Sequence, residues 1–204
     1  GNWNVKLTPG LASPGAVNTI KSNLPAFPSL WINELEADNV TSITNSSGEH
    51  SPWLELYNPS TNAISLAGLY LANTYTNALL WPFPNDASIQ PGEFKVLFAD
   101  GRTNLSSASE LHVNFSLPSL AGSLLLSRVA NSQTQVLDYV DYTNLAPDHS
   151  YGSLPDGQSF DRQAFFLATP GSTNNGTSGP LTVAINEWMA SNTRTIRNPA
   201  DTNK

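Results

Sequence analysis

The chain contains the segment Trp53-Leu54-Glu55-Leu56-Tyr57-Asn58-Pro59, which has the pattern of a β-strand that ends in a turn. Side chains of a strand alternate between its two faces, so Leu54 and Leu56 share one face and are the natural core pair. Three side chains share the opposite face: Trp53, Glu55 and Tyr57. Asn58-Pro59 suits a turn, because proline presets φ. We therefore expect a β-sheet with Leu54 and Leu56 in its core.

Similar short apolar segments recur along the chain, separated by turn signals. Proline presets φ and glycine tolerates positive φ, so pairs such as Pro91-Gly92 and Asp100-Gly101 mark turns. No segment sustains helical periodicity with caps. The expected strands are 30–36, 53–57, 69–72, 87–89, 94–99, 111–115, 123–127, 135–141 and 164–167. Many short strands of this kind predict an all-β sandwich or barrel.

The composition predicts a globular unit with an unusually uncharged surface. Hydrophobic residues make up 39% of the 204 residues, whereas charged residues make up 12%, about half of the ordinary share of roughly 25%. A unit of about 140 residues can bury a hydrophobic core without disulfides or metal ions to stabilise it. The side chains expected to be largely buried are Leu54, Leu56, Leu69, Val96, Phe98, Leu125 and Val136.

Charge and cysteine usage limit the partners. Nine Lys and Arg against sixteen Asp and Glu give a net charge of −7, and no run of Lys or Arg occurs. Nucleic acid is therefore not an expected partner, because the chain has no cluster of Lys and Arg to neutralise its phosphate groups. No apolar run reaches the roughly 18 residues of a membrane helix, so we expect no membrane insertion. The absence of Cys together with abundant Asn, Ser and Thr predicts an extracellular or cell-envelope protein of bacterial type.

Two segments of the chain occur twice at nearly the same offset. Residues 32–39 return as residues 185–192, an offset of 153 positions, and Ser13-Pro14-Gly15 returns as Thr169-Pro170-Gly171, an offset of 156. Two matches with nearly one period predict a tandem array. The expected organisation is a tail fragment of one repeat over 1–18, a linker over 19–29, a complete sandwich over 30–171, a linker over 172–180 and the start of a further repeat over 181–204.

The last of these segments is expected to pair with a sheet that is not its own. Residues 181–188 match the first strand of a unit, and an unpaired strand readily adds to another edge. The edge belongs either to the same molecule or to a second copy, which would make a dimer. Deletion of 178–204 should then leave the stability of the sandwich nearly unchanged.

Seven motifs occur in order over residues 32–171: Ile32-Asn33-Glu34, Trp53 to Pro59, Leu66 to Leu71, Trp81-Pro82-Phe83-Pro84, Ile89 to Phe94, Tyr151 to Gly157 and Thr169-Pro170-Gly171. This ordered set resembles the lamin tail domain family in its bacterial form. The resemblance implies an immunoglobulin-like β-sandwich and an accessory module without catalytic residues. The DNA contact of animal members is not expected here, since the chain lacks basic character. The structural motif comprises Ile32, Asn33, Glu34, Trp53, Glu55, Tyr57 and Asn58.

Glu34 and Glu55 are the candidate pair for acid–base chemistry. Glu55 shares a strand face with two aromatic residues, which can partly desolvate a carboxylate. The alternative is a structural carboxylate that accepts loop N–H groups or pairs with Arg102 or Arg128, and the sequence favours this interpretation.

Nucleophilic catalysis and zinc lack support in the sequence. There is no Gly-x-Ser-x-Gly segment, and His50, His112 and His149 lie in unrelated contexts that predict solvated or capping roles. No cofactor is expected. Calcium is the one metal left open, with hard oxygen ligands at Asp38-Asn39, Asn85-Asp86, Asp138 with Asp141, and Asp148. Turn formation and solubility are the favoured roles of these residues.

The aromatic residues could form a platform for sugar rings. The candidate ligand-binding residues are Trp81, Phe83, Tyr70 and Tyr75. Packing in the core or at the end of the sandwich is the favoured alternative.

These observations predict a non-catalytic structural or interaction module in a tandem array of a larger bacterial extracellular protein. Its expected partner is a protein or a polysaccharide at the cell surface. The alternative is a carbohydrate-binding accessory module that uses exposed aromatic rings. A hydrolase that uses Glu34 or Glu55 ranks below both.

Overall fold

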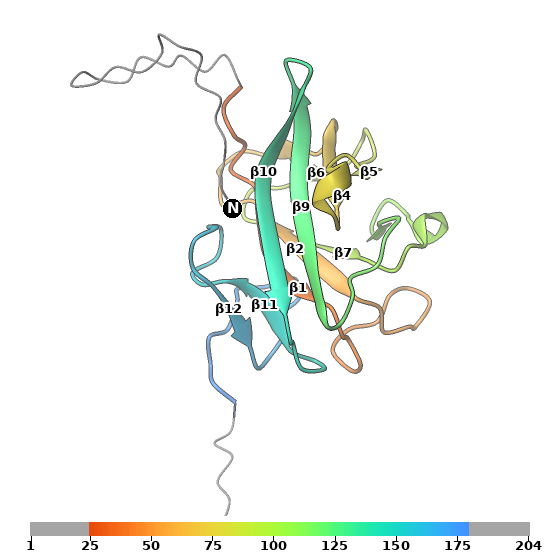
Figure 1. Cartoon of the computed structure of the whole chain (residues 1–204), viewed down its shortest axis with the longest axis vertical. Coiled ribbons are helices and arrows are strands. Elements are labelled where there is room, and N and C mark those ends of the chain that lie inside the picture. Colours follow the sequence, from red (N-terminus) through yellow and green to blue (C-terminus); the bar gives the residue numbers. More distant parts are fainter. Residues whose placement is uncertain (1–24, 180–204) are drawn as a thin grey trace, which may run out of the picture.

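The computed structural model describes residues 25–179, which form two packed layers of β-strands (Figure 1). The strands are β1 Trp31–Glu36, β2 Trp53–Tyr57, β3 Ile64–Ser65, β4 Leu69–Ala72, β5 Trp81–Pro82, β6 Ser88–Ile89, β7 Phe94–Phe98, β8 Leu111–His112, β9 Ala121–Ala130, β10 Gln133–Thr143, β11 Ser150–Ser153 and β12 Arg162–Phe165. Two 3-10 turns, η1 Tyr75–Asn77 and η2 Thr103–Leu105, are the only helical elements among the described residues. None of the described helices is long and apolar enough to cross a membrane.

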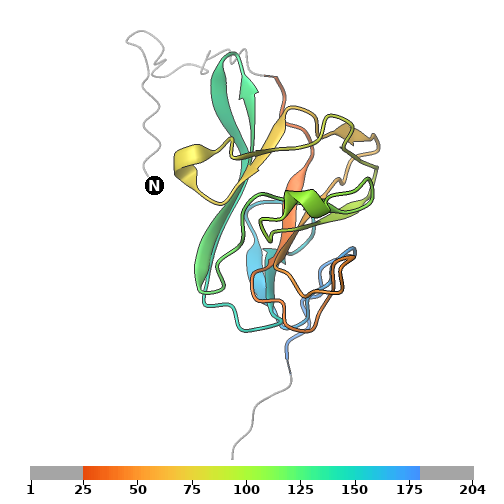
Figure 2. The same ribbon diagram turned by 90° about the vertical axis from the view of Figure 1, so that its right-hand side faces the viewer.

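The two layers are a six-stranded and a four-stranded sheet. The first has the order β12-β11-β1-β2-β7-β8, the second has the order β10-β9-β4-β5, and β3 and β6 form a small ribbon. All pairs are antiparallel except β7 with β8. The long β9–β10 hairpin crosses in front of β1 and β2, and the view turned by 90° shows it as a separate layer (Figures 1 and 2). This is an immunoglobulin-like β-sandwich, as predicted.

The hydrophobic core lies between the two sheets. Leu54 and Leu56 have no exposed surface and belong to this core, which confirms the face assigned to β2. Val96 is only half-buried, contrary to expectation. The register explains the difference, because Leu97 pairs with core-facing Leu54 while Val96 pairs with Glu55. Leu97 is therefore the core residue of β7.

Val136 is also half-buried rather than buried. The pairing of β10 with β9 shifts between Val136 and Asp138, which marks a β-bulge that interrupts the alternation of the strand. Val140, after the bulge, lies in the core instead. The other expected core residues are buried: Leu69, Phe98 and Leu125.

The predicted strands 53–57 and 69–72 match the structure, while others differ. Trp81 and Pro82, which the predicted strands do not include, form the short edge strand β5, which pairs with β4 and tolerates proline. The last strand begins and ends two residues before the predicted 164–167. Strand β11 was not predicted, although it pairs directly with β1.

The sandwich continues beyond the predicted boundary at residue 171. Asn174 is buried and hydrogen-bonded to the sheet, so the linker predicted over 172–180 begins too early. At the other end, the carbonyl of Pro25 accepts a hydrogen bond from Arg128, within the linker predicted over 19–29. The repeat fragments predicted over 1–18 and 181–204 lie outside the described residues, so their organisation stays a prediction.

Candidate functional site

A β-bulge in β1 places two polar side chains on one face of the six-stranded sheet. The pairing of β1 with β2 shifts between Ile32 and Glu34, and Asn33 has no partner residue across the ladder. In a regular strand Ile32 and Glu34 would share a face. Here Ile32 and Leu35 reach the core, while Asn33 and Glu34 bond to residues outside it. The bulge therefore sets the geometry of the whole cluster.

Glu34 is fully buried and binds the segment 169–174, which we call the closing segment. The backbone N–H of Thr169 donates to Oε1 and Oε2 at 3.1 and 3.2 Å, and its hydroxyl donates to Oε2 at 3.0 Å. The hydroxyl of Ser150 donates to Oε1 at 2.5 Å. Burial raises the pKa of Glu34 to about 7, because desolvation outweighs these hydrogen bonds.

Glu55, on the neighbouring strand, binds the same segment. The N–H of Gly171 donates to Oε2 at 2.6 Å, and the amide of Asn33 donates to Oε1 at 3.1 Å. Burial raises the pKa of Glu55 to about 8, and the charge of Glu34 adds to the effect. The predicted structural alternative is the observed one, since a loop N–H and a side-chain amide bind Glu55 and an arginine does not.

Asn174 completes the attachment of the closing segment. Its side-chain amide donates to the carbonyl oxygens of Asn33 at 3.1 Å and Ser153 at 2.7 Å. Its backbone N–H donates to Asp156 Oδ1 at 3.1 Å. Strand β11 approaches so closely that a Cβ on Gly152 would lie 2.3 Å from the carbonyl oxygen of Asn33. Only glycine fits there.

The cluster around Glu34 and Glu55 attaches the closing segment to the sheet, and its carboxylates are not open to a substrate. All four carboxylate oxygens of Glu34 and Glu55 accept hydrogen bonds from the protein, and neither residue has exposed surface. Neither carboxylate lines the surface hollow described below. The geometry therefore supports a structural role for both.

The remaining motif residues also have structural contacts. The indole N–H of buried Trp53 donates to Glu36 Oε2 at 2.6 Å. The ring of Tyr57 stacks on Phe94 with centroids 4.1 Å apart. The amide of Asn58 donates to three backbone carbonyl oxygens, at Asn62, Ile89 and Gln90, at 2.8 to 3.2 Å. Asn58 thereby ties the turn after β2 to the segment before β7.

The predicted aromatic residues do not form one platform. Trp81 and Phe83 are buried in the core, with ring centroids 4.9 Å apart in an edge-to-face contact. The packing alternative therefore describes these two residues, and they offer no ring face to a sugar. Tyr70 is half-buried. Tyr75 alone is exposed, and its hydroxyl donates to Asp141 at 2.8 Å.

The candidate calcium ligands do not come together in one site, although Asp148 lies next to Asp38, whose carbonyl accepts from its backbone N–H at 2.9 Å. Asp148 binds the backbone N–H groups of Val40 and Thr41 through Oδ1 and the Thr41 hydroxyl through Oδ2, which is a turn-stabilising role. Asn85 and Asp86 lie exposed in a separate loop. Within residues 25–179, no group of three or more His, Asp or Glu side chains is arranged to hold a metal ion.

His112 differs from the expected solvated or capping role. It is fully buried, with Nδ1 2.9 Å from Asp100 Oδ2 and Nε2 2.9 Å from Glu110 Oε1. Glu110 in turn accepts hydrogen bonds from Ser46, so the group links β8 to the loop after β1. The same group includes Asp100, which follows β7. The ring nitrogens of His50 and His149 lie at hydrogen-bond distance from nearby backbone carbonyls, and the His149 ring also contacts Phe166 edge to face.

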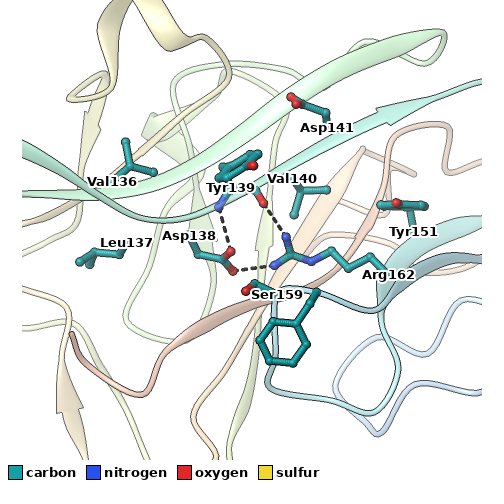
Figure 3. Close-up of a pocket in the computed structure, with 10 residues that line it drawn as sticks. Val136, Leu137, Asp138, Tyr139, Val140, Asp141, Tyr151, Ser159 and Arg162 are labelled. Atoms are coloured by element: carbon teal, nitrogen blue, oxygen red, sulfur yellow. Dashed lines mark hydrogen bonds and ion pairs between the residues drawn. The ribbon is translucent and has the colours of Figure 1, made fainter. Parts of the chain in front are cut away.

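A surface hollow of about 480 Å³ lies where β10 faces β12, and the sequence motifs did not indicate it. Figure 3 shows Arg162 reaching from β12 to Asp138 and to the backbone of Tyr139. Arg162 donates to Asp138 Oδ2 at 2.7 Å and to the carbonyl of Tyr139 at 2.5 Å. Asp138 also accepts from the N–H of Ile32 at 2.9 Å, which joins the two sheets. Tyr139, Tyr151 and Phe160 contribute aromatic rings to the hollow.

The comparison with protein families finds a match to a known domain family. A family model described as the lamin tail domain matches residues 25–144, more than half of the chain. The match ends before β11 and β12, although β11 pairs with β1 in the same sheet. No curated protein sequence matches the chain.

Proposed function

Because the chain belongs to the lamin tail domain family, we propose that it is a non-catalytic module of a tandem array in a larger bacterial extracellular or cell-envelope protein. Each module spaces its neighbours and presents its surface to a protein or polysaccharide partner. The family is one of immunoglobulin-like structural domains. A structural role agrees with the burial of Glu34 and Glu55, whose oxygens all accept hydrogen bonds from the protein.

The proposal depends on one observation: the two segments that bind each other in this unit, the start of β1 and the closing segment, both occur a second time in the sequence. In the described unit, Asn33 and Glu34 bind the closing segment at 169–174. The first segment recurs as Ile185-Asn186-Glu187. The second recurs as Ser13-Pro14-Gly15, followed by Asn18 at the spacing of Asn174 from Thr169. Repetition of the residues that close a unit supports an array of separately closed units.

A protein with two units in tandem tests the proposal. Residues 25–177 joined to a second copy of 25–179 keep the spacing between the closing segment and the next first strand. We expect small-angle scattering to show two separate bodies and chemical denaturation to give the midpoint of the single unit. A single compact body, or a large shift of the midpoint, would contradict an array of independent spacers.

A further inference from the structure

The hollow between β10 and β12 carries an exposed phenylalanine on a well-fixed turn. Phe160 is 89% exposed. Its N–H and that of Asp161 both donate to Oε1 of the buried Gln158, at 2.7 and 2.8 Å. The Gln158 amide donates back to the carbonyl of Asp161, and Ser153 Oγ donates to the Gln158 carbonyl at 2.7 Å. The ring is therefore presented to solvent without a need to order the loop on binding.

A second ring and an oriented carboxylate lie on the other side of the hollow. Tyr139 is 44% exposed and contacts Tyr75 edge to face, with centroids 6.2 Å apart. Asp141 Oδ1 accepts hydrogen bonds from Tyr75 at 2.8 Å and from Ser123 at 2.7 Å. These two donors fix the carboxylate, and no described residue donates to its Oδ2. One oxygen therefore holds the group in place while the other can accept from a ligand.

Arg162 gives the hollow a rigid wall. Its side chain is only 8% exposed, and its two terminal nitrogens bind Asp138, Tyr139 and Ile32. Its Nε is a buried donor without a hydrogen-bond partner among residues 25–179. Buried donors of this kind are rare and costly, so Arg162 is held in place by the bonds of its terminal nitrogens alone. Figure 3 shows Arg162 beside Asp138, Ser159 and Tyr151 in this wall.

We propose that this hollow binds a neutral polysaccharide. Pyranose rings have apolar faces and hydroxyl edges, so they match exposed rings at Tyr139 and Phe160 beside a free acceptor on Asp141. The inference rests on the proposed function as an interaction module and names the partner of that module.

Charge decides between neutral and acidic glycans. The chain carries a net charge of −7, and the acidic residue Asp141 lines the hollow. Among the described residues that line the hollow, Arg162 is the only cation, and it is already paired with Asp138. An acidic polysaccharide would meet repulsion without a free counter-charge, whereas a neutral one would not.

Affinity electrophoresis and calorimetry of the full chain with soluble neutral polysaccharides test this assignment. The panel comprises β-glucan, α-glucan, xylan, mannan and galactomannan, with polygalacturonate as the acidic member. The variants are Phe160→Ala and Tyr139→Ala in the hollow and Phe27→Ala as the matched control. Phe27 is 58% exposed and lies against Arg128, outside the hollow. Unfolding midpoints verify that each variant folds.

We expect at least one neutral polysaccharide to bind, with affinity about tenfold weaker in each hollow variant and unchanged in Phe27→Ala. Binding that survives both hollow substitutions would overturn the site. Failure of the whole neutral panel, preferential binding of polygalacturonate, or self-association or peptide binding that Phe160→Ala abolishes would each overturn the polysaccharide assignment. In all of these cases the two-unit experiment still decides the array function separately.

Discussion

Leu56 has no exposed surface and lies in the core between the two sheets. Leu56→Ala removes buried methyl groups and leaves a cavity that the packed sheets cannot fill. We expect the free energy of unfolding to fall by about 2 to 5 kcal/mol. Chemical denaturation measures the change, and Leu120→Ala, at a side chain that is 76% exposed, serves as the control and should change it by less than about 0.5 kcal/mol. A similar small effect at Leu56 would contradict the assigned core.

Glu34 and Glu55 make the stability depend on pH in an unusual direction. Their folded pKa values, about 7 and about 8, lie above the ordinary value of 4.5. A raised carboxyl pKa contributes stability that is present below the unfolded pKa and is lost as pH rises through the folded pKa. We therefore expect the free energy of unfolding to fall between pH 5 and 8, by about 1.4 kcal/mol per pH unit for each group still protonated.

The matching variant for this prediction is Glu55→Gln, which removes one titrating group and keeps the shape of the side chain. Denaturation curves at pH 5, 6, 7 and 8 should show a shallower fall in stability than in the unchanged protein. Stability that rises with pH over this range would show that hydrogen bonds from Thr169, Gly171 and Asn33 outweigh desolvation.

At the scale of elements, the closing segment holds together strands that are distant in the sequence. Asn174→Ala removes the donors to the carbonyls of Asn33 and Ser153 and leaves both buried acceptors without them. We expect a loss of about 2 to 4 kcal/mol, since each unsatisfied buried group costs about 1 to 3 kcal/mol. Thr173→Ala, at an exposed neighbour, should change stability little. Equal effects of the two substitutions in chemical denaturation would contradict the anchoring role of Asn174.

Alternation within single strands predicted β2 and its core face, because burial on one face imposes a period of two. It could not predict the bulges at Asn33 and Leu137, since one inserted residue changes the face of those that follow. The bond between Asn33 and Asn174 joins residues 141 positions apart, and no local pattern encodes such a pair. In the sequence, Phe160 is distinguished only as an aromatic residue within a polar turn.

At the scale of the whole molecule, two cuts near the C-terminus should have opposite effects. Ending the chain after residue 179 keeps every described contact of the closing segment. Ending it after residue 168 removes Thr169 and Gly171. The buried side chains of Glu34 and Glu55 then lose the hydrogen bonds that these two residues donate. We expect the first truncation to change the free energy of unfolding by less than about 0.5 kcal/mol. The second should cost about 3 kcal/mol or more or prevent folding, because unpaired buried carboxylates are strongly unfavourable.

Chemical denaturation of both truncated chains beside the full chain measures this difference, and circular dichroism verifies that each retains its β-structure. A loss of several kcal/mol on removal of 180–204 would show that these residues belong to this domain, and the predicted repeat boundary would then be wrong. An unchanged stability for the chain that ends at 168 would mean that closure does not depend on Glu34 and Glu55. The closing segment would then be a linker, and its recurrence at Ser13-Pro14-Gly15 would no longer support separately closed units.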